Sequence, residues 1–297
     1  MISIAICTHE RSDDVALCVS ALAPQLAGQS DELIVVDSCS TPQHAAALKS
    51  LSELHGATLL RLETPGLSLA RNAALGAARG DWVAFLDDDT IPAPNWLPSL
   101  HKVVDNAPAG LAGVGGQTEP LWPSELSSRH ISKRWLFYLS CIQAPLRRSV
   151  RAGAKVCGAN LAFRKDRLLS VGAFRTDLGR IGDRLIGGEE SLVIRLLLRA
   201  GFEVIYEPSV AVKHRIHAER LSISWIGKRA YWEGVTEVAM VKATGEHFPP
   251  NLAVSKLAAS ALIFHGLFFA TRNPDFLIRA KIAAGALTRR RALNLPT

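Results

Sequence analysis

Three consecutive carboxylates, Asp87, Asp88 and Asp89, directly follow the apolar run 82–86. A short apolar run of this kind is typical of a strand that is covered on both faces of its sheet. Three neighbouring acids repel one another unless a cation lies among them. Hard divalent ions such as Mg²⁺ and Mn²⁺ prefer oxygen ligands, and nucleotide diphosphates often complete their coordination. The triplet therefore predicts a metal–nucleotide site, with a solvated acidic turn or a helix N-cap as the alternative.

Further polar residues occupy positions that one edge of a sheet would bring together. Thr8 and Asp37 each follow a predicted strand, and Arg71 lies near the start of a predicted helix. In a doubly wound α/β sheet, such positions converge on one crevice. Asp37 can accept a hydrogen bond from a base or a ribose, and Arg71 offers a fork of donors to phosphate. Each residue alone fits an ordinary turn or a surface helix equally well, so the prediction depends on the combination.

Strands and helices alternate through the first half of the chain. The apolar pattern predicts strands over 2–7, 32–36, 57–62 and 82–86. It predicts intervening helices over 13–27, 43–54 and 69–78. This alternation is typical of βαβ units, so we expect an α/β fold with a mostly parallel sheet flanked by helices. Later short strands are predicted within 110–116 and over 201–206 and 210–213, followed by a helical C-terminal extension.

Composition narrows the class of protein. The chain has 297 residues, of which 48% are hydrophobic and 21% charged, as in a globular protein of one large or two small domains. Its net charge of +7 favours an anionic partner such as a nucleotide phosphate or a lipid head group. Residues 129–167 contain ten Lys or Arg and one acid, which indicates a basic loop or a solvated face. Nucleic acid ranks last, because no basic–aromatic interleaving is visible.

The cysteines and the N-terminus bear on localisation. The five cysteines form no C-x-x-C pair, which is typical of a reduced cytosolic protein. Residues 1–6 have no basic leader and are predicted to be a strand rather than a signal peptide. We therefore expect a cytoplasmic protein, with contact at the inner face of the cell membrane left open.

The C-terminal extension raises the question of membrane contact. Residues 257–270 form an apolar segment of about fourteen residues, whereas a spanning helix needs about twenty. Its flanks are basic, with Arg272, Arg279, Lys281 and 289–291. This pattern fits a hairpin or amphipathic segment that lies in a membrane interface. A helical appendage packed on the main domain is the alternative.

The motifs together resemble those of inverting glycosyltransferases of family 2, which have the Rossmann-like GT-A fold. The resemblance covers roughly residues 1–215. Its matching segments are 4–11, 34–38, 66–72, 80–89, Pro92, 96–97, 158–160, 188–190 and 199–201. It implies a catalytic domain over 1–215, with the donor site in 1–120 and the acceptor and base part in 121–215. Residues 216–297 lie outside the resemblance and are expected to be a helical extension, with association with a membrane left open.

The resemblance also implies site roles. In the donor site, Asp89 would bind Mn²⁺ or Mg²⁺, Asp87 would face the ribose and the metal, and Asp88 would be secondary. His214 follows a strand where many relatives have a histidine near the metal, although a structural histidine is the alternative. The nucleotide base and diphosphate would be contacted by Thr8, Glu10, Asp37 and Arg71.

The catalytic base is expected at the start of a helix. The family usually has Glu-Asp where this chain has Glu189-Glu190, and the second acid removes the acceptor's proton. Glu190 falls on that position, but Leu192 and Leu196 replace usual polar residues, so a local shift leaves Glu189 as a second candidate. Stabilisation of the helix macrodipole is the structural alternative for both. Inverting transfer is a single in-line displacement, so one base suffices.

The expected function is metal-dependent inverting transfer from a UDP- or dTDP-sugar to a lipid-linked or polysaccharide acceptor, in the synthesis of cell-envelope polysaccharide or glycolipid. A nucleotidyltransferase is one alternative, although residues 8–11 lack the glycine of a phosphate loop. A non-catalytic, membrane-associated scaffold is another, and the intact acids argue against it.

Overall fold

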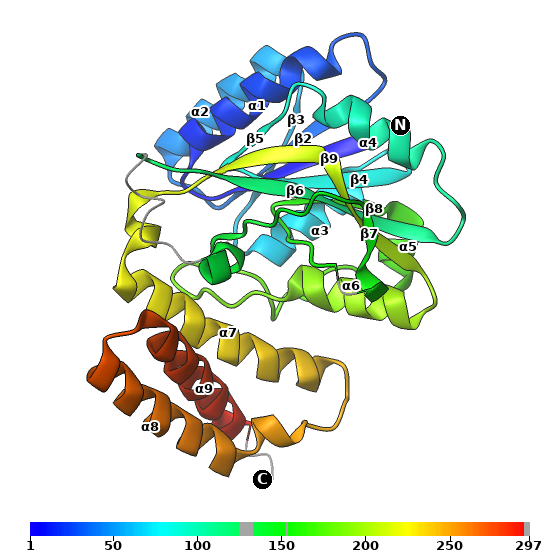
Figure 1. The fold of residues 1–297 in the computed structure, drawn as a ribbon. Helices are drawn as coiled ribbons and strands as arrows, with labels where there is room; N and C mark the ends of the chain where they lie inside the picture. Colours follow the sequence, from blue (N-terminus) through cyan, green and yellow to red (C-terminus); the bar gives the residue numbers. More distant parts are fainter. Residues whose placement is uncertain (125–132, 153, 294–297) are drawn as a thin grey trace. The chain divides into compact units, whose positions relative to one another are not determined.

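The computed structural model describes residues 1–124, 133–152 and 154–293, and the chain divides into two compact units (Figure 1). The first comprises Met1–Thr176 and Val193–Ile216, and the second Asp177–Leu192 and His217–Thr297. Part of the basic segment expected within 129–167, namely 129–132 and 153, lies outside the described residues. The functional division at residue 215 stays a prediction.

The described part of the first unit contains a nine-stranded mixed sheet in the order β3-β2-β1-β4-β8-β6-β9-β5, with β7 also paired to β9. Four adjacent parallel strands are β1 (Ile2–Thr8), β2 (Glu32–Ser38), β3 (Thr58–Leu62) and β4 (Trp82–Asp87). The others are β5 (Thr90–Pro92), β6 (Leu111–Leu121), β7 (Arg148–Ser149), β8 (Asn160–Arg164) and β9 (Glu203–Arg215). Strand β8 runs antiparallel to both β4 and β6, whereas β6 and β9 are parallel.

Helices cover both faces of this sheet. In β1, Ile4 and Ile6 enter one hydrophobic core while Ala5 enters the other, so the strand is apolar along its whole length. The first core is lined by α1 (Ser12–Leu26) and α4 (Trp96–Val104), and the second by α3 (Leu67–Ala77) and the later part of α6 (Glu189–Arg199). The remaining helices are α2 (Pro42–His55), α5 (Lys165–Ser170), η2 (Lys133–Leu139) and η3 (Val150–Ala152).

The predicted α/β fold with a mostly parallel sheet is confirmed, but the prediction of two short strands over 201–213 is wrong. A single strand, β9, runs through this region. On β6, Gly116 pairs with Glu207 and the next residue, Gln117, pairs with Ala211, so residues 208–210 bulge out of the ladder. The Asn160 amide donates to Val210 O at 2.8 Å and closes the bulge. Gly116 is required there, because an added Cβ would lie 2.1 Å from Val210 O.

The second unit is helical, as expected for the C-terminal extension. Its long helices are α7 (Ile223–Ala243), α8 (Val254–Thr271) and α9 (Pro274–Ala292), with short turns η4 (Ala218–Leu221) and η5 (Pro250–Leu252). Helices α7 and α9 are in backbone contact at two glycines. A Cβ on Gly234 would lie 1.9 Å from Ile282 O, and one on Gly285 would lie 1.8 Å from Tyr231 O. Helix α8 has 18 residues and is longer than the predicted segment of about fourteen.

Candidate active site

The acid triplet lies in the turn between β4 and β5, and its backbone is tied to neighbouring strands. Asp87 N donates to Ala159 O at 3.2 Å, and the Thr90 hydroxyl donates to Asp87 O at 2.7 Å. Arg215 N, at the end of β9, donates to Asp89 O at 2.8 Å. The triplet is therefore held at the carboxyl end of β4, which is the edge predicted to carry a ligand.

The three carboxylates have different surroundings. Asp87 is 27% exposed at its side chain, whereas Asp88 and Asp89 are buried. The Thr8 hydroxyl donates to Asp88 at 2.8 Å, and one Arg11 nitrogen lies 3.3 Å from Asp88 and 3.2 Å from Asp89. Burial, followed by the charge of Asp89, raises the pKa of Asp88 to about 7. Asp88 therefore acts as a buried link between Thr8 and Arg11, and its contact with a nucleotide stays a prediction.

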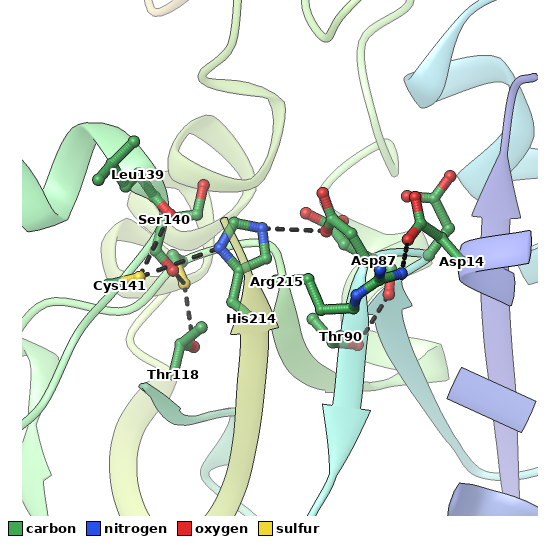
Figure 2. Close-up of polar contacts among 12 residues, drawn as sticks. Asp14, Asp87, Thr90, Thr118, Leu139, Ser140, Cys141, His214 and Arg215 are labelled. Carbon is green, nitrogen blue, oxygen red and sulfur yellow. Dashed lines mark hydrogen bonds and ion pairs between the residues drawn. The ribbon is translucent and has the colours of Figure 1, made fainter. Parts of the chain in front are cut away.

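Asp89 faces His214 from the neighbouring strand β9. The distance from Asp89 Oδ1 to His214 Nε2 is 3.0 Å, and both side chains are buried. On the other side of the ring, Nδ1 lies 3.9 Å from Cys141 Sγ, whose thiol donates to Leu139 O at 3.3 Å (Figure 2). The imidazole is therefore held between Cys141 and Asp89. Nε2 lies where it can donate a proton to the Asp89 carboxylate or, without that proton, share a metal ion with it.

These residues fit a divalent metal that is shared with a substrate. Within the described ranges, no group of three or more His, Cys, Asp or Glu side chains is arranged to hold a metal ion. The Asp89–His214 pair offers one oxygen and one nitrogen, and Asp87 is accessible in the same turn. Mg²⁺ is usually held by one or two carboxylates together with substrate phosphates and waters. The donor set therefore suits a metal–diphosphate complex rather than a closed metal cage.

The residues predicted to contact the base form a second group. Asp37 is buried, forms an ion pair with Arg61, and accepts from Ser40 N at 2.9 Å. Glu10 N donates to the Ser40 hydroxyl at 2.9 Å, so Ser40 links the two acids. The Glu10 carboxylate accepts from Thr41 N at 2.6 Å. Both acids lie at the carboxyl edge of the parallel strands, Asp37 near the end of β2 and Glu10 on the loop that follows β1.

Arg71 is 3% exposed and acts as a clamp on the triplet. Its Nη2 lies 3.2 Å from Asp87 Oδ1 and donates to Gly158 O at 3.1 Å. The guanidinium lies over the rings of Phe85 and Phe174, 6.0 and 5.6 Å from their centroids. A Cβ on Gly158 would lie 2.8 Å from Nη2, which explains the glycine in the motif 158–160. Contact of Arg71 with a base or diphosphate stays a prediction.

Glu189 and Glu190 are the first two residues of α6 and belong to the second unit. Glu189 is buried and Glu190 is partly exposed. Gly187 N donates to the Thr236 hydroxyl of α7 at 3.0 Å, which anchors the segment just before the helix. Gly188 has φ 89°, a left-handed conformation that favours glycine. Both acids lie in the first turn, where the helix macrodipole stabilises a negative charge.

Sequence reasoning missed several partners of these acids. Arg11 lies inside the quoted motif 4–11 but received no role, although a cation three residues after a strand end is a usable signal. Arg61 and Cys141 contact Asp37 and His214 across long stretches of chain, and nothing in the sequence pairs them. Arg215 forms an ion pair with Asp14 of α1 beside Thr90 (Figure 2), which secures the end of β9.

The sequence is also similar to known glycosyltransferases and polysaccharide biosynthesis proteins. Residues 3–150 match the model of glycosyl transferase family 2. The chain is similar to a glucosyl-dolichyl phosphate glucuronosyltransferase of Haloferax volcanii, with 26% identity over 80% of this chain and 77% of that protein. It is also similar to the succinoglycan biosynthesis protein ExoM of Rhizobium meliloti, with 27% identity over 97% of this chain and 92% of that protein.

Solved structures agree on the fold. A mannosyltransferase from Pyrobaculum calidifontis, PcManGT, in complex with GDP-Man and Mn²⁺, has a TM-score of 0.64 at 20% identity and covers 97% of this chain and 86% of its own. A glucosyl-3-phosphoglycerate synthase from Mycobacterium tuberculosis, in complex with Mn²⁺, UDP and phosphoglyceric acid, has a TM-score of 0.52 and covers 84% of this chain and 80% of its own. The chain belongs to glycosyltransferase family 2, and it is a glycosyltransferase with the GT-A fold.

Proposed function

We propose that this protein transfers a sugar from a nucleotide diphosphate donor to an acceptor hydroxyl, with inversion at the anomeric carbon and with help from Mn²⁺ or Mg²⁺. The observation that carries the proposal is the 3.0 Å pair of Asp89 and His214, beside the accessible Asp87 of the same D-x-D segment. One oxygen and one nitrogen ligand suit a metal whose remaining positions are taken by diphosphate oxygens and water. The metal would stabilise the charge that grows on the leaving diphosphate.

The chain's own residues would divide the remaining work. Asp87, held by Arg71, would orient the ribose, and Asp37 would accept a hydrogen bond from the base. Thr8 and Arg11 contact Asp88 and thereby fix the turn that carries Asp87 and Asp89. Removing either of these two contacts would misplace the donor, since a displacement of about 1 Å can lower a rate about a hundredfold.

Proton transfer is assigned to the start of α6. Glu190 is partly exposed and would take the proton from the acceptor hydroxyl, within about 2.6–3.2 Å of it. Glu189 is buried and would serve to orient that segment, although it stays the second candidate for the base. A single displacement needs only one such carboxylate, because no covalent intermediate forms.

The donor and acceptor classes come from the resemblance and the relatives. One relative is named a glucosyl-dolichyl phosphate glucuronosyltransferase and another is named for succinoglycan biosynthesis, and these names favour a lipid-linked or polysaccharide acceptor in cell-envelope synthesis. Solved neighbours hold GDP-Man, UDP or UDP-GlcNAc, and we assign a UDP- or dTDP-sugar to this chain. The protein would act in the cytoplasm at the inner face of the membrane, as a peripheral protein.

A donor screen tests this proposal. Thermal unfolding of the purified chain is measured with each nucleotide sugar, with and without Mn²⁺. We expect one UDP- or dTDP-sugar to raise the melting temperature only when the metal is present. The anomeric configuration of the product, read by NMR, should be opposite to that of the donor. A retained configuration would overturn the inverting assignment, and no stabilisation by any nucleotide sugar would overturn the donor-site assignment.

A further inference from the structure

Helix α8 exposes an apolar surface that is unusual for a helix in water. Of its 18 residues, all of them described, only Leu257 is buried. Leu262, Ile263 and Phe269 are 76%, 60% and 60% exposed. A surface helix normally carries charged residues on its outer face. Between Lys256 and Arg272 the sequence contains no charged residue at all.

The other side of α8 is already occupied within the second unit. Leu257 joins a core with Ala283 and Ala286 of α9. The ring of Phe264 stacks on Phe276 with centroids 6.3 Å apart. Helices α8 and α9 therefore form a packed antiparallel hairpin (Figure 1), and the exposed face of α8 is the one that points away from this core.

Cations surround the apolar face. Residues 254–293 contain seven Lys or Arg and a single acid, Asp275. The Arg272 guanidinium lies 5.8 Å from the centroid of Phe269, and that of Arg279 lies 5.5 Å from the centroid of Phe264. An apolar face with cationic ends is typical of a helix that lies at the surface of an anionic bilayer.

The structure assigns to α8 a membrane-docking face in which Leu262, Ile263, Leu267 and Phe269 enter the interface of an anionic bilayer while Lys256 and Arg272 contact lipid head groups. This deepens the membrane contact within the proposed function, but it does not depend on the transfer reaction. The protein would thereby be held beside a lipid-linked acceptor.

Length and composition alone would also allow α8 to cross a membrane, as the one such helix in the described part of the chain. Its partner argues against crossing. Helix α9 packs along α8 and carries Asp275, Arg279, Lys281 and the run 289–291. A spanning α8 would draw these charges into the hydrocarbon, where each costs at least about 2.5 kcal/mol on insertion scales. Lying in the interface leaves the exposed Arg279 in water, whereas Arg290 is already buried within the unit.

A second copy of the chain is a poorer occupant for the same face. An isologous contact places the same patch of both copies against each other, so it would bring the cationic ends and flanks of two α8–α9 hairpins together. Like charges would then oppose the contact, whereas an anionic bilayer complements them.

Vesicle binding of the full chain tests the inference. We compare vesicles of phosphatidylcholine alone with vesicles that also contain phosphatidylglycerol, using co-sedimentation. The unchanged protein should bind the anionic vesicles more tightly. The triple variant Leu262→Ser, Ile263→Ser, Phe269→Ser should bind them at least about tenfold more weakly, since three apolar side chains lose their burial. The matched control is Leu54→Ser on α2, where an equally exposed leucine (77%) lies in the first unit.

Depth and oligomeric state complete the test. The variant Ile263→Trp adds one tryptophan to the six of the chain. Its fluorescence in excess of that of the unchanged protein should be quenched most by lipids that carry bromine near the head groups. Quenching at the bilayer centre, or binding unaffected by the triple variant, would overturn the inference. So would a dimer in lipid-free solution that the triple variant dissociates. UDP binding is measured in parallel, because its loss with vesicle binding intact would contradict the proposed function and leave the docking face standing.

Discussion

The two units depart from the ordinary distribution of side chains in opposite ways. The first buries charge, with Asp88, Asp89 and Arg71 all inside the sheet edge. The second exposes apolar surface, along the outer face of α8. Buried charges and large exposed apolar patches are both unfavourable for a free chain, and both mark functional sites. We infer from this difference that the buried charges would bind a cation and a diphosphate, and that the exposed apolar face would bind a bilayer.

The largest effect is expected from neutralising the metal-facing acid. Asp89→Asn removes one of the two charges near the metal position, so transfer should fall on the order of a hundredfold or more. Donor turnover at several Mn²⁺ concentrations measures it. Asp13→Asn, at an exposed position in the first turn of α1, is the control and should retain normal activity. Equal activity of the two variants would contradict metal binding by Asp89.

The base comes next, and its test separates two neighbouring acids. Glu190→Gln keeps the shape of the side chain but cannot accept the proton, so transfer should fall about a hundredfold while UDP binding persists. Single-turnover assays and nucleotide titration are run on this variant and on Glu189→Gln. If Glu189→Gln alone loses transfer, the base lies one residue earlier than proposed.

A third prediction concerns the positioning of His214. Cys141→Ala removes the group that faces Nδ1, so Mn²⁺ affinity should fall about tenfold or more, as for other residues that orient a metal ligand. Cys141→Ser offers a similar partner and should recover most of the affinity. Titration of Mn²⁺ in the presence of UDP measures both. A serine variant as weak as the alanine variant would show that the cysteine only fills space.

The fourth prediction concerns the stability of the second unit, at the glycine contact between α7 and α9. Gly285→Ala places a methyl group against Tyr231 O, and overpacking of this kind costs about 1–3 kcal/mol or more. Gly266→Ala on α8 meets nothing within 4 Å and should gain about 0.5–1 kcal/mol from helix propensity. Calorimetry on both variants tests this difference, with UDP binding as the readout of the first unit. Loss of stability in the Gly266 variant would contradict the packing described for α8.

The smallest effect is a pH dependence at the far end of the first unit. Burial lowers the pKa of His101, but hydrogen bonds to Asp31 and Asp105 outweigh it and raise the pKa above its ordinary value. The stabilisation is therefore complete below the unfolded-state pKa and is lost as pH rises through the folded-state pKa. Against His101→Gln, the unchanged protein should gain less than about 1 kcal/mol on going from alkaline to mildly acid pH. A gain with the opposite sign would contradict the pairing.

Sequence patterns predict the first four strands to within two residues. Strands β1, β2 and β4 are buried on both faces and so read as apolar runs, whereas the edge strand β3 is only partly buried. The same patterns split β9 in two, since Glu207, Pro208 and Ser209 resemble a turn and only the register shift of β6 accommodates them. They also shorten α8, because Lys256 lies within its first turn and breaks the apolar run.

The candidate site is predictable in its acids and not in their partners. Asp37 and Asp87 lie at the ends of β2 and β4, and Asp89 directly follows β4, which a pattern can reveal. Their contacts with His214 and Arg61 depend on which strands become neighbours, and the pairing of β5 with β9 is decided by tertiary packing. The burial of Arg71 depends likewise on Gly158, which lies 87 residues further along the chain.

One measurement addresses the central claim directly, namely that the first unit's buried charges hold a metal–diphosphate complex. Crystals of the full chain grown with Mn²⁺ and UDP would be measured at the manganese absorption edge. We expect one anomalous peak at a metal–ligand distance of about 2.1 Å from Asp89 and His214, in contact with the diphosphate. UDP bound in this unit with no manganese beside Asp89, or with the metal held elsewhere, would contradict it.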